Sequence, residues 1–150
     1  MAQTRTKLIG RFFTNKDKDA YSMANWVKVD SNLTNPGTGE IVFEQKGVEF
    51  PDTWSQNAIN IVSQKYFAGT PGTEGREYSL KQLIDRVVNT ITEHGQANGY
   101  FLDEEEAESF SQELKYILMT QRAAFNSPVW FNIGVSDRSQ QASACFILAV

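Results

Sequence analysis

Apolar residues recur at three- and four-residue spacing in the middle of the chain, and this spacing predicts amphipathic helices. The first predicted helix follows Pro51 and ends near Gly69. The second starts at Ser79, which can cap a helix while Gln82 bonds back to it, and Gly95 is placed to end it. The apolar faces comprise Trp54, Ala58, Ile61, Val62 and Lys65 or Tyr66 in the first helix, and Leu80, Leu83, Ile84, Val87, Val88 and Ile91 in the second.

A third helix is predicted from Asp103 to about Gln121, after a turn at Asn98-Gly99. Its buried face is expected to comprise Ala107, Phe110, Leu114, Ile117 and Leu118. The acidic run from Asp103 to Glu106 suits the first turn of a helix, where negative charge interacts favourably with the helix dipole. Consecutive helical residues point in different directions, so we interpret this run as a solvated helix start rather than a metal site.

A small β-hairpin is predicted before the helices, where Trp26 to Val29 and Ile41 to Phe43 flank a turn-forming stretch at residues 35–39. Proline fixes φ in that stretch and glycine accepts positive φ. Residues 26–121 therefore form a helical region with a hairpin. Residues 1–25 are polar and of mixed charge, and we expect an arm that is ordered only against other parts of a larger body.

Residues 122–150 differ in kind from the rest of the chain. Residues 125–134 are aromatic and turn-forming, with neither a helical nor a strand period. From Ser143 to Val150 the chain is almost unbroken apolar, which is typical of a strand covered on both faces. Such a strand needs more neighbours than the predicted hairpin and helices offer, so we expect that Val150 is not a natural domain end.

Composition narrows the classes of function. The 150 residues carry a net charge of -4, with both signs spread along the chain, which argues against nucleic-acid binding. One cysteine and one histidine leave no internal disulfide and no pair of soft metal ligands. No apolar stretch approaches the roughly 20 residues that span a bilayer, and the start lacks a signal core, so we expect a cytoplasmic protein with no membrane contact.

Few residues could carry chemistry, and each also has a structural interpretation. Cys145 starts the predicted strand, where it could be reactive at a strand end or a buried apolar filler. Ser127 could contact an anionic ligand or only form a turn. His94 suits the end of a helix, where its charged form interacts with the dipole. Trp130 and Phe131 could stack on a ligand, although aromatic residues in such segments are more often core plugs.

Two segments, taken together, resemble the amino-terminal part of class II, adenosylcobalamin-dependent ribonucleotide reductases. They are residues 125–132 (Phe-Asn-Ser-Pro-Val-Trp-Phe-Asn) and residues 143–147 (Ser-Ala-Cys-Phe-Ile). Further stretches are similar to the same family in the same order, namely Arg11-Phe12-Phe13-Thr14, Val42-Phe43-Glu44-Gln45, Trp54-Ser55-Gln56, Gln64-Lys65-Tyr66-Phe67, Arg86-Val87-Val88 and Gly99-Tyr100-Phe101. The resemblance therefore extends over nearly the whole chain.

The resemblance implies an α/β fold in which this chain begins a ten-stranded α/β barrel. The chain itself would be mainly α-helical, with a small β-hairpin, and residues 122–150 would start the catalytic barrel and end in a barrel strand. In this family a cobalamin-derived radical generates a cysteine thiyl, which abstracts the ribose 3′ hydrogen of a ribonucleotide. Two further cysteines then reduce the 2′ position.

By the same resemblance, Cys145 matches the first cysteine of the reducing pair, and its partner is expected beyond Val150. Ser127 and the backbone at Ala144 and Cys145 look like substrate contacts, with Ser143 a weaker candidate. Many family members have a further cysteine where Gln141-Ala142 stands in this chain. None of these residues is expected to bind a metal.

The resemblance also implies adenosylcobalamin as cofactor, a ribonucleoside diphosphate or triphosphate as substrate, and a thioredoxin-like protein or a dithiol as reductant. It implies the remaining carboxy-terminal part of the reductase as a partner and is compatible with a homodimer of the complete enzyme. Because the thiyl cysteine, the acid–base residues and most cobalamin-binding segments would follow Val150, we expect these residues to be inert alone. A fragmentary gene, an amino-terminal extein and a reductase encoded as two polypeptides would each account for such a chain.

Two interpretations from other classes stay open on the residues alone. The helices could form a stand-alone interaction module that docks through its aromatic segment, although this leaves the spacing of Asn-Ser-Pro and Ser-Ala-Cys without a reason. A cysteine-dependent hydrolase or peroxidase would use Cys145 as nucleophile, and His94 is the only histidine that could serve as its base.

Overall fold

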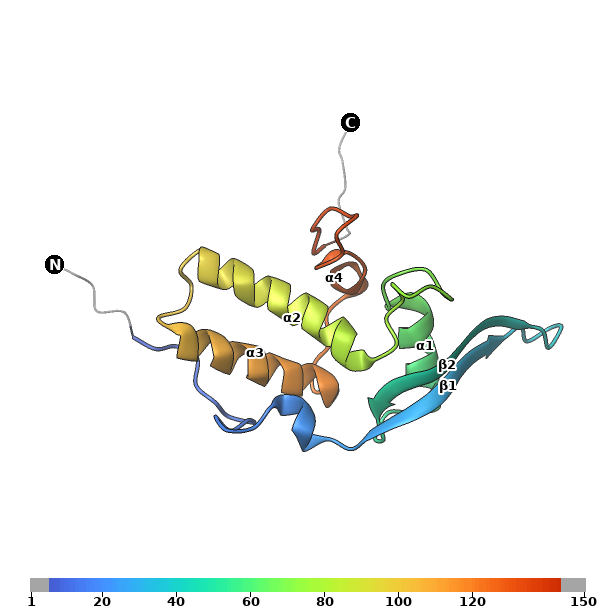
Figure 1. Ribbon diagram of the computed structural model, residues 1–150, viewed down its shortest axis with the longest axis horizontal. Coiled ribbons are helices and arrows are strands. Elements are labelled where there is room, and N and C mark those ends of the chain that lie inside the picture. The colour runs from blue at the N-terminus through green and yellow to red at the C-terminus, as the bar shows by residue number, and fades with distance from the viewer. Residues whose placement is uncertain (1–5, 144–150) are drawn as a thin grey trace.

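Two long helices packed side by side, and a β-hairpin that projects away from them, set the shape of the molecule (Figure 1). The computed structural model describes residues 6–143. Its elements are the 3-10 helix η1 (Ala20–Met23), the strands β1 (Trp26–Thr34) and β2 (Ile41–Pro51), and the helices α1 (Gln56–Lys65), α2 (Leu80–Ala97), α3 (Glu104–Met119) and α4 (Ser127–Asn132). The predicted helical body with a hairpin is confirmed, whereas the predicted final strand lies, after Ser143, outside the described residues.

The core forms where α2 meets β2, α1, the end of α3 and α4. The apolar stripe of α2 is buried as predicted, and Leu83, Ile84 and Val87 are at most 2% exposed. Phe50 from β2 and Met119 from α3 are fully inaccessible in the same cluster. Burial of one such side chain contributes roughly 1.5–3 kcal/mol, so this cluster is the main source of hydrophobic stabilisation.

The structure confirms α1 and α3 but shortens both. Ser55 caps α1 and Asp103 caps α3, each through its side chain. The helices end at Lys65 and Met119, before the predicted ends near Gly69 and Gln121. Among residues 6–143, no helix is both long and apolar enough to cross a membrane.

The second helix begins as predicted and ends later than predicted. Ser79 and Gln82 form the predicted capping box. Gly95 lies inside α2, so its predicted role as the helix end is wrong, and Gly99 makes the turn instead with φ 65°. Gly95 has a different function, because a Cβ there would lie 2.7 Å from the Phe101 ring. The glycine therefore permits the chain after α2 to pack closely against the helix.

The hairpin has the predicted turn, but its strands are longer than predicted. Near the helices its side chains join the core, with Val48 and Phe50 fully buried. Its distal half extends beyond α1 in Figure 1 and leaves Ile41 and Val42 exposed. The sequence pattern missed the continuation of β2 because a register shift occurs near Gly47, which has φ 65° and interrupts the alternation of side chains.

The aromatic segment contains a helix that the sequence pattern did not predict. α4 is six residues long, and Pro128 stands in its first turn, where its missing N–H removes no helical hydrogen bond. A helix of this length is too short to display a period of apolar residues. The prediction of residues 125–134 as irregular is therefore wrong for the six residues of α4.

The amino-terminal arm runs beside α3 (Figure 1). Side chains of α3 accept hydrogen bonds from the backbone of the arm. Glu113 accepts hydrogen bonds from the Phe13 N–H (2.9 Å), the Thr14 N–H (2.7 Å) and the Thr14 hydroxyl (2.6 Å). Glu106 accepts one from the Ile9 N–H (2.8 Å). The expectation that the arm is ordered only against other parts of a larger body is wrong for these residues.

Glu106 also corrects the interpretation of the acidic run as a solvated helix start. Its side chain is 2% exposed, whereas Glu104 and Glu105 are exposed as expected. Hydrogen bonds from the N–H groups of Leu102 and Ile9 hold the pKa of Glu106 below its ordinary value. The first turn of α3 is thus a docking point for the arm, because an ionised carboxylate satisfies several backbone donors at once.

Two opposing effects determine the pKa of the Glu113 carboxyl. Burial raises the pKa of this carboxyl, but hydrogen bonds from the Thr14 hydroxyl and from the backbone of Phe13 and Thr14 outweigh burial. The pKa of Glu113 therefore lies below its ordinary value of 4.5. A carboxylate with a lowered pKa in the folded state adds stability above its ordinary pKa and loses this contribution as the pH falls through the folded value.

We predict that Glu113→Ala lowers the free energy of unfolding by about 1–3 kcal/mol, because the buried donors of Phe13 and Thr14 lose their acceptor. Urea denaturation measures the change. Glu108→Ala is the matched control, since Glu108 is exposed on the same helix, and it should change stability by less than about 0.5 kcal/mol. Equal losses in the two variants would contradict the role of Glu113.

Acid should release the arm before the core unfolds. As the pH falls below 4.5, amide protection factors at Phe13 and Thr14 should drop, because protonation of Glu113 removes their charged acceptor. Hydrogen exchange at a series of pH values measures this drop. In Glu113→Gln the pH-dependent step at these two amides should disappear, and an unchanged step would show that another group causes it.

Candidate functional site

Ser127, the predicted substrate contact, is the first residue of α4 and has a half-buried side chain. Its Oγ lies 3.1 Å from the hydroxyl of Tyr66, the C-cap residue of α1, and either oxygen can be the donor. A serine hydroxyl has one donor and two acceptor positions. Contact with Tyr66 therefore orients the Ser127 hydroxyl and leaves it able to bond to a ligand.

The segment that carries Ser127 begins with a sharp turn at the end of α3. Gln121 has φ 57°, a left-handed conformation that costs a non-glycine residue roughly 1–2 kcal/mol. The Gln121 N–H donates to the Leu118 carbonyl (3.2 Å) and the Arg122 N–H donates to the Ile117 carbonyl (3.0 Å). This pair of bonds is a Schellman motif, which ends α3 and turns the chain toward α4.

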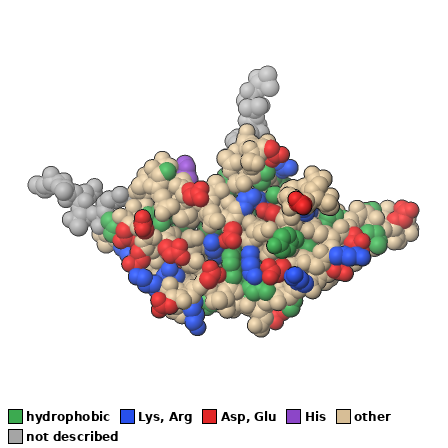
Figure 2. All heavy atoms as spheres, viewed as in Figure 1, with side chains coloured by type: hydrophobic (Ala, Val, Ile, Leu, Met, Phe, Trp, Pro, Cys, Tyr) green, Lys and Arg blue, Asp and Glu red, His purple; other side chains and the backbone are tan. Residues whose placement is uncertain are grey.

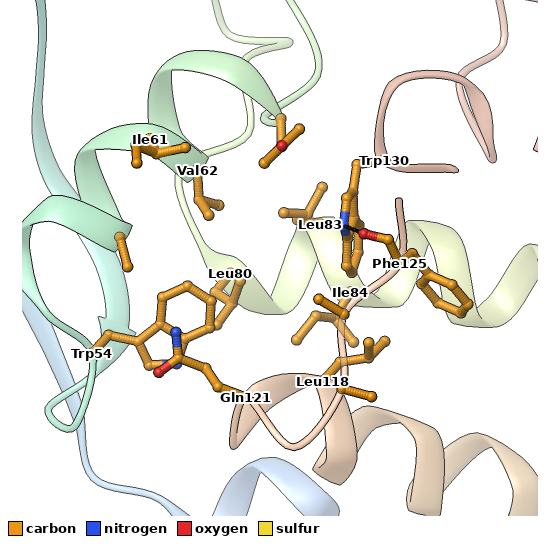
Figure 3. Close-up of a pocket in the computed structure, with 14 residues that line it drawn as sticks. Trp54, Ile61, Val62, Leu80, Leu83, Ile84, Leu118, Gln121, Phe125 and Trp130 are labelled. Carbon is orange, nitrogen blue, oxygen red and sulfur yellow. Dashed lines mark hydrogen bonds between the residues drawn. The ribbon is translucent and has the colours of Figure 1, made fainter. Parts of the chain in front are cut away.

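Trp130 anchors α4 in the core. Its side chain is 9% exposed, and its indole N–H donates to the Phe125 carbonyl at 3.0 Å (Figure 3). The interpretation of Trp130 as a core plug is confirmed. Phe131 is 37% exposed, and its ring lies 5.3 Å from that of Tyr66. The two aromatic neighbours therefore differ, since only Phe131 presents part of its ring to solvent.

Arg86 of α2 connects this segment to the rest of the molecule. Its Nη1 donates to the Ile133 carbonyl (2.7 Å), and its Nη2 donates to the carbonyls of Trp130 (3.2 Å) and Tyr66 (3.3 Å). Its Nε forms an ion pair with Glu77 at 2.7 Å, and both side chains are 11% exposed. The Arg86 guanidinium thus contacts α4, the residue that follows α4, the C-cap residue of α1, and Glu77 in the loop before α2.

Gly134 allows Arg86 to approach the chain closely. It has φ 73°, and a Cβ at this position would lie 2.6 Å from both the Arg86 carbonyl oxygen and the Arg86 Cγ, and 2.8 Å from the Thr90 hydroxyl. Both the backbone conformation and the lack of space therefore require glycine here. The result is that the chain after α4 lies directly against α2.

An apolar groove of 470 Å³ is lined in part by the segment between α3 and α4, from which Gln121 and Phe125 are labelled in Figure 3. Ile61 and Val62 of α1, Leu80, Leu83 and Ile84 of α2, and Trp54, Leu118 and Trp130 provide most of its walls. Tyr66 is the one titratable residue in the lining. This groove can accept an apolar group, but its side chains do not provide an acid–base pair.

A smaller hollow of 310 Å³, which Tyr66 also lines, has a polar lining. Lys65, Arg76, Arg138 and Asp137 contribute charges to it. On the face drawn in Figure 2, Lys and Arg are interspersed with Asp and Glu. The hollow beside Tyr66 can therefore attract an anionic group locally, without a broad basic surface around it.

The other predicted site residues lie at or beyond the edge of the described chain. Ser143 is exposed, and its carbonyl accepts a hydrogen bond from the Gln141 side chain (3.0 Å). Ala144 and Cys145 lie outside the described residues.

His94 is exposed near the end of α2, within 3.5 Å of the Asn98 amide. Among residues 6–143, no three His, Cys, Asp or Glu side chains cluster to hold a metal ion.

Sequence reasoning missed Tyr66, Glu77 and Arg86 as parts of the site. The sequence places Lys65 or Tyr66 on the apolar face of the first helix, and Tyr66 lies in a stretch similar to the family. Neither observation gives the Tyr66 hydroxyl the polar partner that it needs at the end of such a face. Arg86 lies between the apolar pairs of α2, and this position gave a signal, because a cation flanking a buried stripe usually meets an acceptor there. The identity of its acceptors depends on tertiary structure.

The sequence comparisons agree with the resemblance. A family model described as class II vitamin B12-dependent ribonucleotide reductase matches residues 28–121. A vitamin B12-dependent ribonucleotide reductase of Streptomyces avermitilis is 51% identical over 142 residues, which cover 95% of this chain and 15% of the relative. Enzymes of the same name from Streptomyces clavuligerus and Rhodopirellula baltica are 49% and 40% identical, over 98% and 86% of this chain and 15% and 12% of their own length.

These relatives are, by name, ribonucleotide reductases. The chain belongs to the class II vitamin B12-dependent family of these enzymes. It spans about 15% of the length of its Streptomyces relatives.

Gly134→Ala should destabilise the protein more than the same substitution at Gly72, which has φ 83° and open space around it. Gly72→Ala meets only backbone strain, about 1–2 kcal/mol, whereas Gly134→Ala adds overpacking against Arg86 of about 1–3 kcal/mol. Thermal or urea denaturation measures both changes. Equal costs would mean that the segment after α4 moves freely away from α2.

Proposed function

We propose that this chain is the amino-terminal part of a reductase that converts ribonucleotides to 2′-deoxyribonucleotides by thiyl radical chemistry. In the overall reaction the C2′–O bond breaks and the oxygen leaves as water. Two thiols supply the two electrons and two hydrogens and become one disulfide. The match to the class II family over residues 28–121 is the observation that supports this proposal most strongly.

Cys145 is the proposed first member of the reducing thiol pair, with its partner in a later part of the polypeptide. The support is its place in Ser-Ala-Cys-Phe, which resembles the family motif. A thiol that must give up hydrogen and then close a disulfide needs a partner within short range, which a position at the end of a barrel strand would provide. The barrel itself remains part of the proposal.

Ser127 is the proposed side-chain contact to the substrate, together with the backbone of Ala144 and Cys145 and, more weakly, Ser143. The geometry supports Ser127 because its hydroxyl is half-buried, held by Tyr66, and has spare bonding positions. Tyr66, the partner of this hydroxyl, also lines the polar hollow, where Lys65, Arg76 and Arg138 add positive charge that favours an anionic substrate. A ribonucleoside diphosphate and a triphosphate both fit this description.

Adenosylcobalamin is the proposed cofactor, and when bound it supplies the radical that starts the reaction. Most of its binding segments are expected outside these residues, and no described residue is assigned to it. The remaining carboxy-terminal part of the reductase and a thioredoxin-like or dithiol reductant are the proposed partners. A homodimer of the complete enzyme and a cytoplasmic location stay predictions.

The apolar groove favours a second candidate function, a helical module that binds another protein without catalysis. Its 470 Å³ of apolar space beside a partly exposed Ile61 would suit an apolar side chain of a partner. This alternative gives Cys145 no chemical role. The two functions therefore differ in what they predict for replacement of this cysteine.

We predict that Cys145→Ser abolishes multiple turnover in a complete enzyme. The chain would be joined to the remaining sequence of the Streptomyces avermitilis relative and assayed with adenosylcobalamin, a dithiol and a ribonucleotide. Deoxyribonucleotide formation should be lost because serine cannot form the disulfide. Ser136→Ala, at an exposed position, is the control and should leave turnover unchanged. Retained multiple turnover in Cys145→Ser would refute the assigned role, and an inactive wild-type enzyme would refute the proposed function.

A further inference from the structure

We propose that Arg86, held by Glu77, is a positioning residue that fixes the orientation of the Ser127 hydroxyl and so sets the affinity for substrate. This inference rests on the proposed function, since it takes Ser127 as the substrate contact. Its structural basis is the set of hydrogen bonds that Arg86 makes to two segments that lie far apart in sequence but both lead to Ser127.

The first route from Arg86 to Ser127 passes through α4. Arg86 donates to the carbonyls of Trp130 (3.2 Å) and Ile133 (2.7 Å), which lie at the end of α4 and just after it. The Trp130 carbonyl belongs to the last turn of the helix and the Ile133 carbonyl to its C-cap, where no further helical donor is available to either. The guanidinium therefore caps α4 and fixes the helix that begins with Ser127.

The second route passes through Tyr66. Arg86 donates to the Tyr66 carbonyl at 3.3 Å, and the Tyr66 hydroxyl lies 3.1 Å from Ser127 Oγ. The backbone of Tyr66 is thus held by the same group that holds α4. As a result, both oxygen atoms of the Tyr66–Ser127 contact are placed relative to one rigid side chain on α2.

Glu77 holds Arg86 in the position that both routes require. Its Oε1 accepts from Arg86 Nε (2.7 Å), and its Oε2 accepts from Arg86 Nη2 (3.3 Å) and from the Ala68 N–H (2.7 Å). The pair is nearly buried, so the carboxylate also compensates a charge that would otherwise be costly at this depth. A second link to the chain after α1 comes from the bond to Ala68.

The chemistry of this position specifically requires arginine. A guanidinium presents five donors in a planar fork, which lets Nη1 and Nη2 contact different carbonyls while Nε contacts the carboxylate. A lysine ammonium offers its donors from one atom and cannot span carbonyls on α4 and α1 at once. Arg86→Lys therefore keeps the positive charge beside Glu77 but loses part of the positioning.

The chain also offers a matched control for this substitution. Arg76 is partly buried and likewise donates to backbone carbonyls, at Phe67 (2.7 Å) and Gly69 (2.9 Å), neither of which lies on α4. Arg76→Lys therefore makes the same chemical change in the same neighbourhood. Only Arg86→Lys removes bonds to the helix that carries Ser127.

The first measurement is amide hydrogen exchange in the 150-residue chain. In Arg86→Lys, exchange at Val129 and Ile133 should rise about tenfold through the loss of one or two hydrogen bonds, while Arg76→Lys leaves these amides unchanged. Unchanged exchange at both amides in Arg86→Lys would overturn the proposal. A melting curve for each variant checks that the core remains folded. If Arg86→Lys does not fold, Glu77→Gln replaces it at the same two amides, because it removes the carboxylate charge that holds Arg86 in place.

The second measurement uses the complete enzyme described for Cys145. Arg86→Lys and Tyr66→Phe should each raise the KM for the ribonucleotide several-fold with a smaller change in kcat. Arg11→Lys is the control in this assay and should change neither, because the Arg11 guanidinium donates to the Asn15 carbonyl in the arm and lines no part of the proposed site. Loss of folded protein alone would lower the apparent kcat and leave KM unchanged, and this result would overturn the positioning role. An inactive wild-type enzyme would overturn the proposed function, while the exchange data would still decide whether Arg86 holds α4.

Discussion

The buried ion pair between Glu77 and Arg86 is the interaction on which the carboxy-terminal part of the described structure depends. α4 is too short to be stable alone, since a helix of six residues satisfies few of its own hydrogen bonds. Trp130 provides apolar anchorage, and Arg86 satisfies carbonyls that the helix leaves free. The ion pair is therefore important less for its own energy than for the number of chain segments it orders.

A similar arrangement orders the other end of the chain. Glu106 and Glu113, one on each half of α3, accept backbone hydrogen bonds from the arm, which has little regular structure of its own. A segment without helix or sheet must find partners for its N–H groups elsewhere, and ionised carboxylates are strong acceptors. Both ends of the described chain are thus attached to the two long helices mainly by charged side chains that bind the backbone.

The elements that the sequence predicted well are those whose signals are local. The capping box of Ser79 and the apolar stripe of α2 depend on residues a few positions apart, and both are confirmed. The contacts of Glu106 and Arg86 could not be predicted from local signals. Glu106 contacts Ile9, 97 residues away along the chain, and Arg86 contacts Ile133, 47 residues away. The six residues of α4 were missed because they are fewer than two full periods of a helix. The prediction that Gly95 ends the helix was wrong. Its close contact with Phe101 depends on tertiary structure, which gives no signal in the local sequence.

The candidate site was only partly predictable for the same reason. Resemblance to a family pointed to Ser127, but it gave no indication that Tyr66 and Arg86 support this hydroxyl. These supporting residues come from α1 and α2, which a motif centred on residues 125–132 does not contain. A short motif thus identified the contact, and the tertiary structure supplied the residues around it.

The projecting hairpin has a consequence for how the family can vary. Its turn at residues 35–39 is exposed and closed by short hydrogen bonds between Asn35 and residues 39 and 40. Exposed loop tips tolerate insertions and deletions, and a change of two residues per strand preserves which face each side chain occupies. Each such change would alter the reach of the ribbon by about 7 Å and leave Val48 and Phe50 in the core. Evolution can therefore adjust the length of this ribbon independently of the helical body.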